Sequence, residues 1–275
     1  MKKTFIEYCT GLYILIRPLM VFVTVWLMFV SLRLCGKYIS DDVVRSTTII
    51  SAFGTILIMS MNGIHDLLHD IKKGRTFVHR HLTVAMAIAT GALMIIINVI
   101  IHNDHNLGVM IYGIILIIIA THYYLSYLFR FSSALLVGMS AALVVIVGAE
   151  IGGNITFMHI IIAGMSVVLL FARECLKDIE DYAIDKQSGV VFFIMENTPY
   201  KKTIPVTCGI EITKWFIFGA LVTSVLIGLS ARTHYPLFSL ICAFTISISI
   251  LADLAYKKTA IDFAFFSMLL YLSFI

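Results

Sequence analysis

Residues 155–185 read ITFMHIIIAGMSVVLLFARECLKDIEDYAID, and this stretch decides both the fold class and the place of a site. It begins with an apolar run of about 20 residues, the length that an α-helix needs to cross the hydrocarbon core of a bilayer. It ends in a window dense with charge, from Arg173 to Asp185. The pattern predicts a transmembrane helix with an acidic end at the membrane surface.

The composition of the whole chain agrees with a membrane protein. The 275 residues are 60% hydrophobic and 13% charged, with a mean hydropathy of +0.99, whereas a soluble domain carries roughly 25% charged residues. A net charge of +4 is too dilute for a surface that follows nucleic-acid phosphates. These numbers exclude a soluble globular domain, a disordered chain and a nucleic-acid-binding protein.

Nine apolar runs separated by polar breaks predict an all-α integral membrane protein with nine transmembrane helices around a central cavity. If the N-terminus is cytoplasmic, fifteen of the twenty Lys and Arg residues fall on the cytoplasmic side and four on the other. We therefore expect a cytoplasmic N-terminus and, because no linker interrupts the chain, a single domain over residues 1–275. The predicted spans are residues 11–32, 46–65, 82–101, 107–128, 133–150, 155–175, 211–230, 236–255 and 260–275.

Seven of the sixteen acidic residues lie in two short windows, each at the predicted cytoplasmic end of a span. In the first window, helical spacing of four places Asn62, Asp66 and Asp70 on one face. In the second, a stripe about 60° wide holds four carboxylates, while Glu180 points to the other side. The four are Glu174, Asp178, Asp181 and Asp185.

Carboxylates at this spacing repel one another unless cations neutralise them. Two carboxylate stripes suit Mg²⁺, which prefers oxygen ligands and commonly bridges carboxylates to a substrate's phosphate groups. Nearby basic residues would neutralise the remaining charge of such a group. The windows thus predict a Mg²⁺ and diphosphate site, and the basic candidates are Lys72, Lys73, Arg75, Arg80, Arg173 and Lys177.

The paired windows resemble the two motifs of the UbiA-type intramembrane prenyltransferases, NxxxDxxxD and DxxDxxxD. The second window looks most like the branch that prenylates geranylgeranylglyceryl phosphate. The resemblance implies transfer of a prenyl group from an isoprenyl diphosphate to a lipid-like or aromatic acceptor, with release of diphosphate and the use of Mg²⁺, as two ions.

The resemblance also assigns roles to the residues of the site. The implied metal ligands are Asn62, Asp66, Asp70, Asp178, Asp181 and Asp185. The implied substrate-binding residues are Asn62, Arg80, Arg130, Arg173 and Lys177, and Glu174, Lys177 and Asp181 are the candidates for catalysis. We expect Asp253 and Asp262, beside the last loop, to pair with Lys257 and Lys258 instead of joining the site.

Other functions fit the sequence less well, with one exception. The spacing of His65 and His69 is that of a zinc-protease helix, but Asp66 stands where that mechanism needs Glu. The single-helix Asp/Gly/Arg pattern of a CDP-alcohol phosphotransferase is absent. A transporter would need polar groups at the membrane midplane, whereas the charges of this chain gather at one membrane face. A UbiA-type membrane terpene cyclase, which acts on a prenyl diphosphate without an acceptor, remains open.

Overall fold

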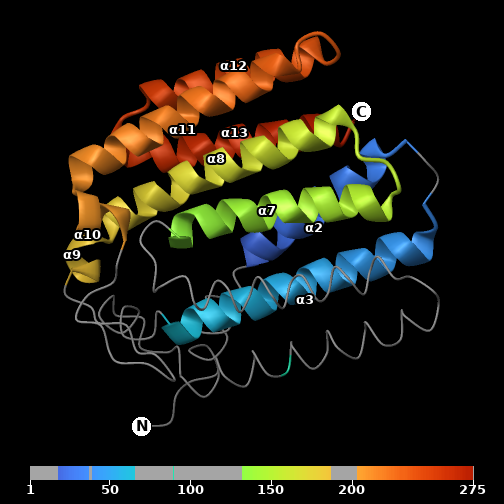
Figure 1. Cartoon of the computed structure of the whole chain (residues 1–275), viewed down its shortest axis with the longest axis horizontal. Coiled ribbons are helices and arrows are strands. Elements are labelled where there is room, and N and C mark those ends of the chain that lie inside the picture. The colour runs from blue at the N-terminus through green and yellow to red at the C-terminus, as the bar shows by residue number, and fades with distance from the viewer. Residues whose placement is uncertain (1–17, 37–38, 66–88, 90–131, 187–202, 275) are drawn as a thin grey trace. The chain divides into compact units, whose positions relative to one another are not determined.

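The computed structural model describes most of the chain as α-helices (Figure 1). The described residues are 18–36, 39–65, 89, 132–186 and 203–274. They contain no strand, in agreement with the predicted all-α class. The predicted spans over residues 82–101 and 107–128 lie outside the described residues, apart from residue 89.

The chain forms two compact units, each built from several segments. The first unit comprises residues 1–25, 40–129 and 183–202, and the second comprises residues 26–39, 130–182 and 203–275. The single domain over residues 1–275 stays a prediction.

The described part of the first unit is mainly one long helix, α3 (Asp41–His65). Asp41 and Asp42 occupy its first turn, where carboxylates are favourable beside the positive end of the helix dipole. Along the helix, the hydroxyls of Ser51 and Thr55 donate hydrogen bonds to carbonyls four residues earlier, at 2.7 and 2.8 Å. These bonds allow polar side chains to lie on an otherwise apolar helix.

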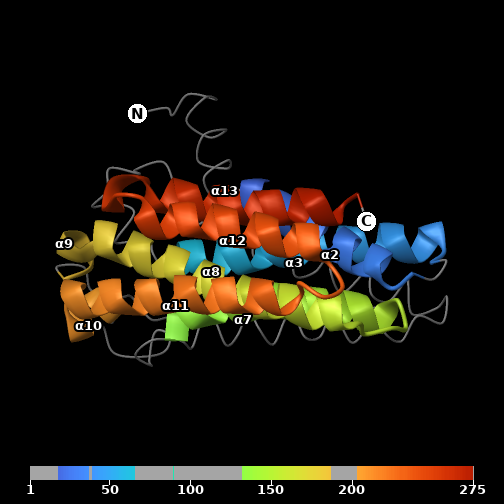
Figure 2. The ribbon, with the colours of Figure 1, turned by 90° about the horizontal axis from the view of Figure 1, so that it is seen from above.

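Helix α8 (Phe157–Glu180) is the centre of the second unit and, within the described residues, packs mainly against four other helices. Its partners are α7 (Ser132–Ile151), α10 (Ile204–Cys208), α11 (Ile210–Ser230) and α13 (Leu254–Leu272). Helix α12 (Pro236–Leu251) packs on α11 and α13. Figure 2 shows the long helices of this unit running alongside one another.

The contact between α7 and α8 is close because Gly138 has no side chain. A Cβ atom at this position would lie 2.4 Å from the carbonyl oxygen of Val167 on α8. Small residues at such contacts let the backbones of transmembrane helices approach each other. Gly138 therefore determines how closely these two helices pack.

The start of α8 is fixed by a buried histidine. The backbone N–H of Thr156 donates to Nδ1 of His159 at 3.0 Å, which makes Nδ1 the acceptor and places the ring proton on Nε2. Nε2 then donates to the carbonyl of Ser31 at 2.9 Å. Ser31 lies near the end of α2 (Pro18–Leu34), so this ring joins α8 to the part of α2 that belongs to the second unit.

Three helices are long and apolar enough to cross a membrane in the part of the chain that the structure describes. They are Ala134–Ile151, Phe157–Glu180 and Ile210–Ser230, which confirms apolar helices at three of the predicted spans. Helices α2 and α12 are apolar but shorter. The count of nine spans and the cytoplasmic N-terminus stay predictions.

The predicted ends of several helices are wrong. Helix α8 continues to Glu180 instead of ending at residue 175, and α3 begins at Asp41 instead of residue 46. The break expected after residue 255 lies earlier, because α12 ends at Leu251 and α13 begins at Leu254. In each case charged residues that were expected in loops extend a helix. Lys258 and Glu180 pair with each other, and Lys257 donates to the carbonyls at the end of α12, whereas Asp41 and Asp42 lie at the positive end of the α3 dipole.

Candidate active site

The acidic end of α8 combines buried carboxylates with the negative end of a helix dipole. Asp178 lies in the last turn, and Asp181 is the residue that follows the helix; their exposed fractions are 7% and 8%. Carboxylates are unfavourable beside the C-terminal end of a helix, which already carries partial negative charge. Burial increases this cost. Such an arrangement is suited to holding a cation.

Glu180 differs from these two aspartates. Its side chain is 52% exposed and accepts a hydrogen bond from the amine of Lys258 on α13 at 3.0 Å. The expected divergence of Glu180 from the stripe is therefore confirmed. A turn at Asp181 separates α8 from the short helix α9 (Tyr182–Asp185), at the end of which Asp185 is fully buried.

Arg173 forms the centre of an ion-pair network one to two turns before the aspartates. Its Nε donates to Oδ1 of Asp262 at 2.7 Å, and its Nη1 donates to Oε1 of Glu174 at 2.8 Å. The amine of Lys177 lies 3.5 Å from the other oxygen of Glu174. The Arg173 side chain is 18% exposed, so these bonds are shielded from water and hold the guanidinium in one orientation.

The expected partners of Asp262 were wrong. Asp262 binds Arg173 on α8, whereas Lys258 binds Glu180 and Lys257 donates to the carbonyls of Ser249 and Ile250. The reason is the early start of α13, since Asp262 lies eight positions after Leu254, the first residue of this helix. At about 1.5 Å per residue, Asp262 lies about 12 Å into the helix and away from the loop.

Asp262 is thus a residue of this site that the sequence reasoning left out. One signal was present, because Asp262 falls inside the apolar run predicted for residues 260–275. An acid within such a run normally has a basic or polar partner inside the protein. The sequence offered no means of choosing Arg173 as that partner.

The first window is described only at its beginning. Asn62 lies on α3, close to the end of that helix at His65, as the predicted end of the second span requires. Asp66, Asp70, Arg80 and Arg130 lie outside the described residues. The meeting of the two windows in one site stays a prediction, since Asn62 belongs to the first unit and Asp178 to the second.

The donor chemistry of the second window fits a hard divalent cation. Asp178, Asp181 and Asp185 supply carboxylate oxygens, the ligands that Mg²⁺ prefers. Within the described segments, no three such side chains lie close enough to form a metal site by themselves. A complete site would therefore need ligands from elsewhere, as the six predicted ligands from two windows already imply.

The second unit is a bundle of apolar helices, long enough in three cases to cross a membrane, with an acidic site at one end. No protein-family model and no curated protein sequence matches the chain. Two solved structures share its fold. One is a structure of digeranylgeranylglyceryl phosphate synthase, with a TM-score of 0.66 and 16% identity over 97% of each chain.

The other is a UbiA homolog from Archaeoglobus fulgidus bound to Cd²⁺. Its TM-score is 0.60 at 17% identity, and the match covers 95% of this chain and 97% of the homolog. The resemblance to UbiA-type proteins is thereby confirmed at the level of the fold, over almost the whole chain.

Proposed function

We propose that the chain is a Mg²⁺-dependent intramembrane prenyltransferase. It would ionise an isoprenyl diphosphate and transfer the prenyl group to a lipid-like or aromatic acceptor, releasing diphosphate. The observation that carries the proposal is the buried pair Asp178 and Asp181 at the negative end of α8. The shared fold with digeranylgeranylglyceryl phosphate synthase supports it.

The two windows would hold the metal ions. Asn62, Asp66 and Asp70 are the proposed ligands of one ion, and Asp178, Asp181 and Asp185 are proposed for the other. Because no three such side chains among the described residues form a metal site by themselves, the second ion would also need ligands from elsewhere. When bound, Mg²⁺ supplies positive charge that stabilises the leaving diphosphate. The carboxylates orient the ions and offset their charge in the partly apolar surroundings of the helix end.

Arg173 and Lys177 would bind the diphosphate itself. A guanidinium has five N–H bonds, and the hydrogen bonds to Asp262 and Glu174 use two of them. The remaining N–H bonds can donate to diphosphate oxygens without any change in the orientation of Arg173. Preorganised donors of this kind stabilise the charge that develops on a leaving group. Arg80 and Arg130 are further proposed diphosphate ligands.

Glu174 has two proposed tasks. It holds Arg173 and Lys177 in place through the hydrogen bond and ion pair at 2.8 and 3.5 Å. It also provides negative charge one turn deeper in the bundle than Asp178, where it would stabilise an allylic cation. Apolar side chains of the surrounding helices would keep water away from that cation until the acceptor's nucleophilic atom attacks.

Product analysis tests the proposal. The purified chain in nanodiscs would be incubated with Mg²⁺ and radiolabelled prenyl diphosphates of several lengths, with geranylgeranylglyceryl phosphate, with an aromatic acceptor, or with neither. We expect a prenylated acceptor and one diphosphate for each transfer. A cyclic hydrocarbon or terpene alcohol formed without acceptor would establish the cyclase instead, and no diphosphate release under any condition would overturn both activities.

A further inference from the structure

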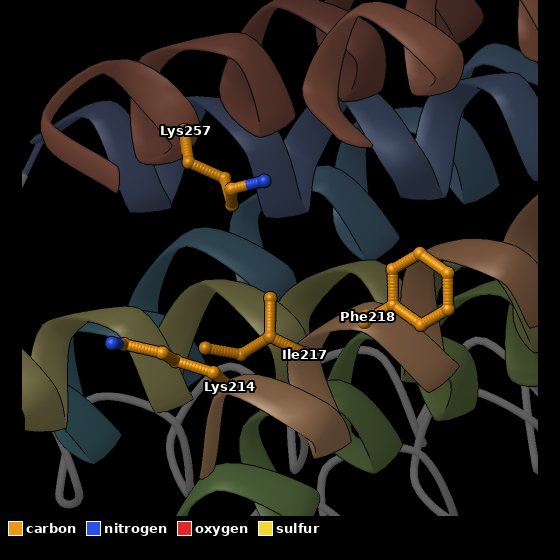
Figure 3. Close-up of a pocket in the computed structure, with 4 residues that line it drawn as sticks. All are labelled: Lys214, Ile217, Phe218 and Lys257. Atoms are coloured by element: carbon orange, nitrogen blue, oxygen red, sulfur yellow. The ribbon is translucent and has the colours of Figure 1, made fainter. Parts of the chain in front are cut away.

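A charged cavity lies between α11 and α13, and we name it the lysine cleft after its lining residues Lys214, Ile217, Phe218 and Lys257. Its volume is 320 Å³. Figure 3 shows Lys257 on one helix and Lys214, Ile217 and Phe218 on the facing helix, with the amines of the two lysines pointing in different directions. The cleft thus combines two amines with an apolar wall.

The cleft exists because α12 is shorter than its neighbour. Helices α11 and α12 are joined by a short turn and packed together, with 21 and 16 residues respectively. Measured from the shared turn, α12 extends about 24 Å and α11 about 32 Å. Helix α12 therefore ends near the level of Lys214 and leaves the first turns of α11 uncovered.

Lys257 lies in the first turn of α13 and faces the cleft beside the end of α12. Its amine donates to the carbonyls of Ser249 and Ile250 at 3.1 and 2.7 Å, which belong to the last turn of that helix. These bonds use two of the three N–H donors of the ammonium group and cover the negative end of the α12 dipole. One N–H donor of Lys257 remains for a ligand.

Lys214 is also able to engage a ligand. It is paired with Glu211 at 2.6 Å, but the side chains are 43% and 80% exposed, and exposed pairs of this kind are weak. Burial holds the pKa of the Lys257 amine below its usual value, and the nearby carboxylate of Asp253 offsets part of this decrease. An incoming phosphate would compete with these two carboxylates at the edge of the cleft.

The aromatic residues beside the two lysines indicate the depth of the cleft in a membrane. Trp215 and Tyr256 are adjacent in sequence to Lys214 and Lys257, and they are 73% and 70% exposed. Exposed Trp and Tyr near the ends of transmembrane helices lie at the level of the lipid headgroups. One turn after Lys214, the exposed ring of Phe218 extends the apolar wall of the cleft toward the apolar part of α11.

We propose that the lysine cleft binds the headgroup phosphate of an anionic phospholipid. Basic pockets between transmembrane helices recognise such headgroups. The remaining donor of Lys257 would bind the phosphate, Lys214 would add positive charge at the edge of the cleft, and an acyl chain would lie along Phe218. The proposal is independent of the prenyl-transfer activity, because none of the four lining residues belongs to the acidic site.

Native mass spectrometry of the full chain tests this proposal. The protein would be released from nanodiscs of phosphatidylcholine that contain a minor share of phosphatidylglycerol. We expect wild-type protein to retain phosphatidylglycerol in preference to phosphatidylcholine. The affinity for phosphatidylglycerol should be about fivefold lower in Lys214→Gln and about 25-fold lower in Lys214→Gln/Lys257→Gln. These factors are the contributions expected of one and of two lysines at an anionic surface. Lys258→Gln is the matched control. It removes the same charge at the position next to Lys257, but the side chain of Lys258 pairs with Glu180 and does not line the cleft.

Three results of the same experiment would contradict the proposal. Equal retention of the two lipids by wild-type protein, or wild-type affinity in the double variant, would overturn the proposal. Displacement of phosphatidylglycerol by inorganic phosphate alone would also overturn it, since the cleft would then be a site for a soluble anion. The wild-type comparison needs no substitution, and retention of phosphatidylcholine by each variant shows that the helices remain assembled.

Discussion

At the scale of single residues, the acidic end of α8 divides its carboxylates between two tasks. Asp178 and Asp181 are buried, whereas Glu180 is exposed and bound to Lys258. This division was predictable, because a rotation of about 100° per residue places Glu180 on the other face. The partner of Asp262 was not predictable, because it depends on the residue at which α13 begins.

Removing one buried carboxylate is expected to weaken metal binding. In Asp178→Asn, Mn²⁺ used as a spectroscopic substitute for Mg²⁺ should bind about 10-fold or more weakly, because loss of even a supporting group in a metal site has an effect of this size. Electron paramagnetic resonance of free Mn²⁺ measures the affinity. Glu180→Gln removes the same charge two residues away and should retain wild-type affinity; equal losses in both variants would show a general charge effect and no specific site.

Loss of the Asp262 carboxylate is expected to disturb Arg173. In Asp262→Asn, a charge-assisted hydrogen bond is weakened, and kcat/KM should fall about tenfold, mainly through KM for the prenyl diphosphate. Asp262→Glu should restore part of the loss. The control is Glu150→Gln, which removes an exposed carboxylate at the other end of the α7 and α8 pair. A fall in kcat with unchanged KM would contradict a role in holding Arg173 for the substrate.

At the scale of helices, the apolar runs predicted which segments form helices but not where the helices end. Hydropathy places an end close to the first charged residues, as at residue 175 of α8, just after Arg173 and Glu174, whereas the structure continues this helix to Glu180. The extension is stabilised by partners on α13, since Arg173 pairs with Asp262 and Glu180 pairs with Lys258. Such pairings depend on neighbouring helices, and hydropathy does not contain that information.

The close contact of α7 and α8 should be sensitive to one methyl group. Gly138→Ala would place a Cβ atom against the Val167 backbone, which cannot move aside as a flexible side chain can. We expect a loss of about 1–3 kcal/mol, the usual cost of overpacking, seen as a lower midpoint of thermal unfolding in detergent. Gly219→Ala on α11 is the control, because nothing lies within 4 Å of its Cβ position. A similar midpoint for the two variants would contradict the close packing.

At the scale of the whole molecule, the fold agrees with the resemblance that the two motifs suggested. The match with digeranylgeranylglyceryl phosphate synthase extends over 97% of each chain, although only 16% of the residues are identical. The pattern of apolar runs and the two acidic windows were therefore enough to indicate the fold. Donor length and acceptor depend on the shape of a cavity, which hydropathy and motifs do not determine.

The predicted orientation can be tested with tags at the two ends of the chain. Nine spans place the N-terminus and C-terminus on opposite sides of the membrane, with the N-terminus in the cytoplasm. In inside-out vesicles, protease should remove an N-terminal tag and leave a C-terminal tag intact, and detergent should expose both. Removal of both tags without detergent would contradict an odd number of spans.

The central claim is that the carboxylates of α8 support metal-dependent ionisation of a prenyl diphosphate. The most direct measurement is the initial rate of diphosphate release from geranylgeranyl diphosphate by purified protein in nanodiscs, with the acceptor geranylgeranylglyceryl phosphate, with Mg²⁺ or with EDTA. We predict release by wild-type protein and by Glu180→Gln with Mg²⁺, none with EDTA, and none by Asp178→Asn. Equal release by wild-type protein and Asp178→Asn, or release that persists in EDTA, would contradict the account.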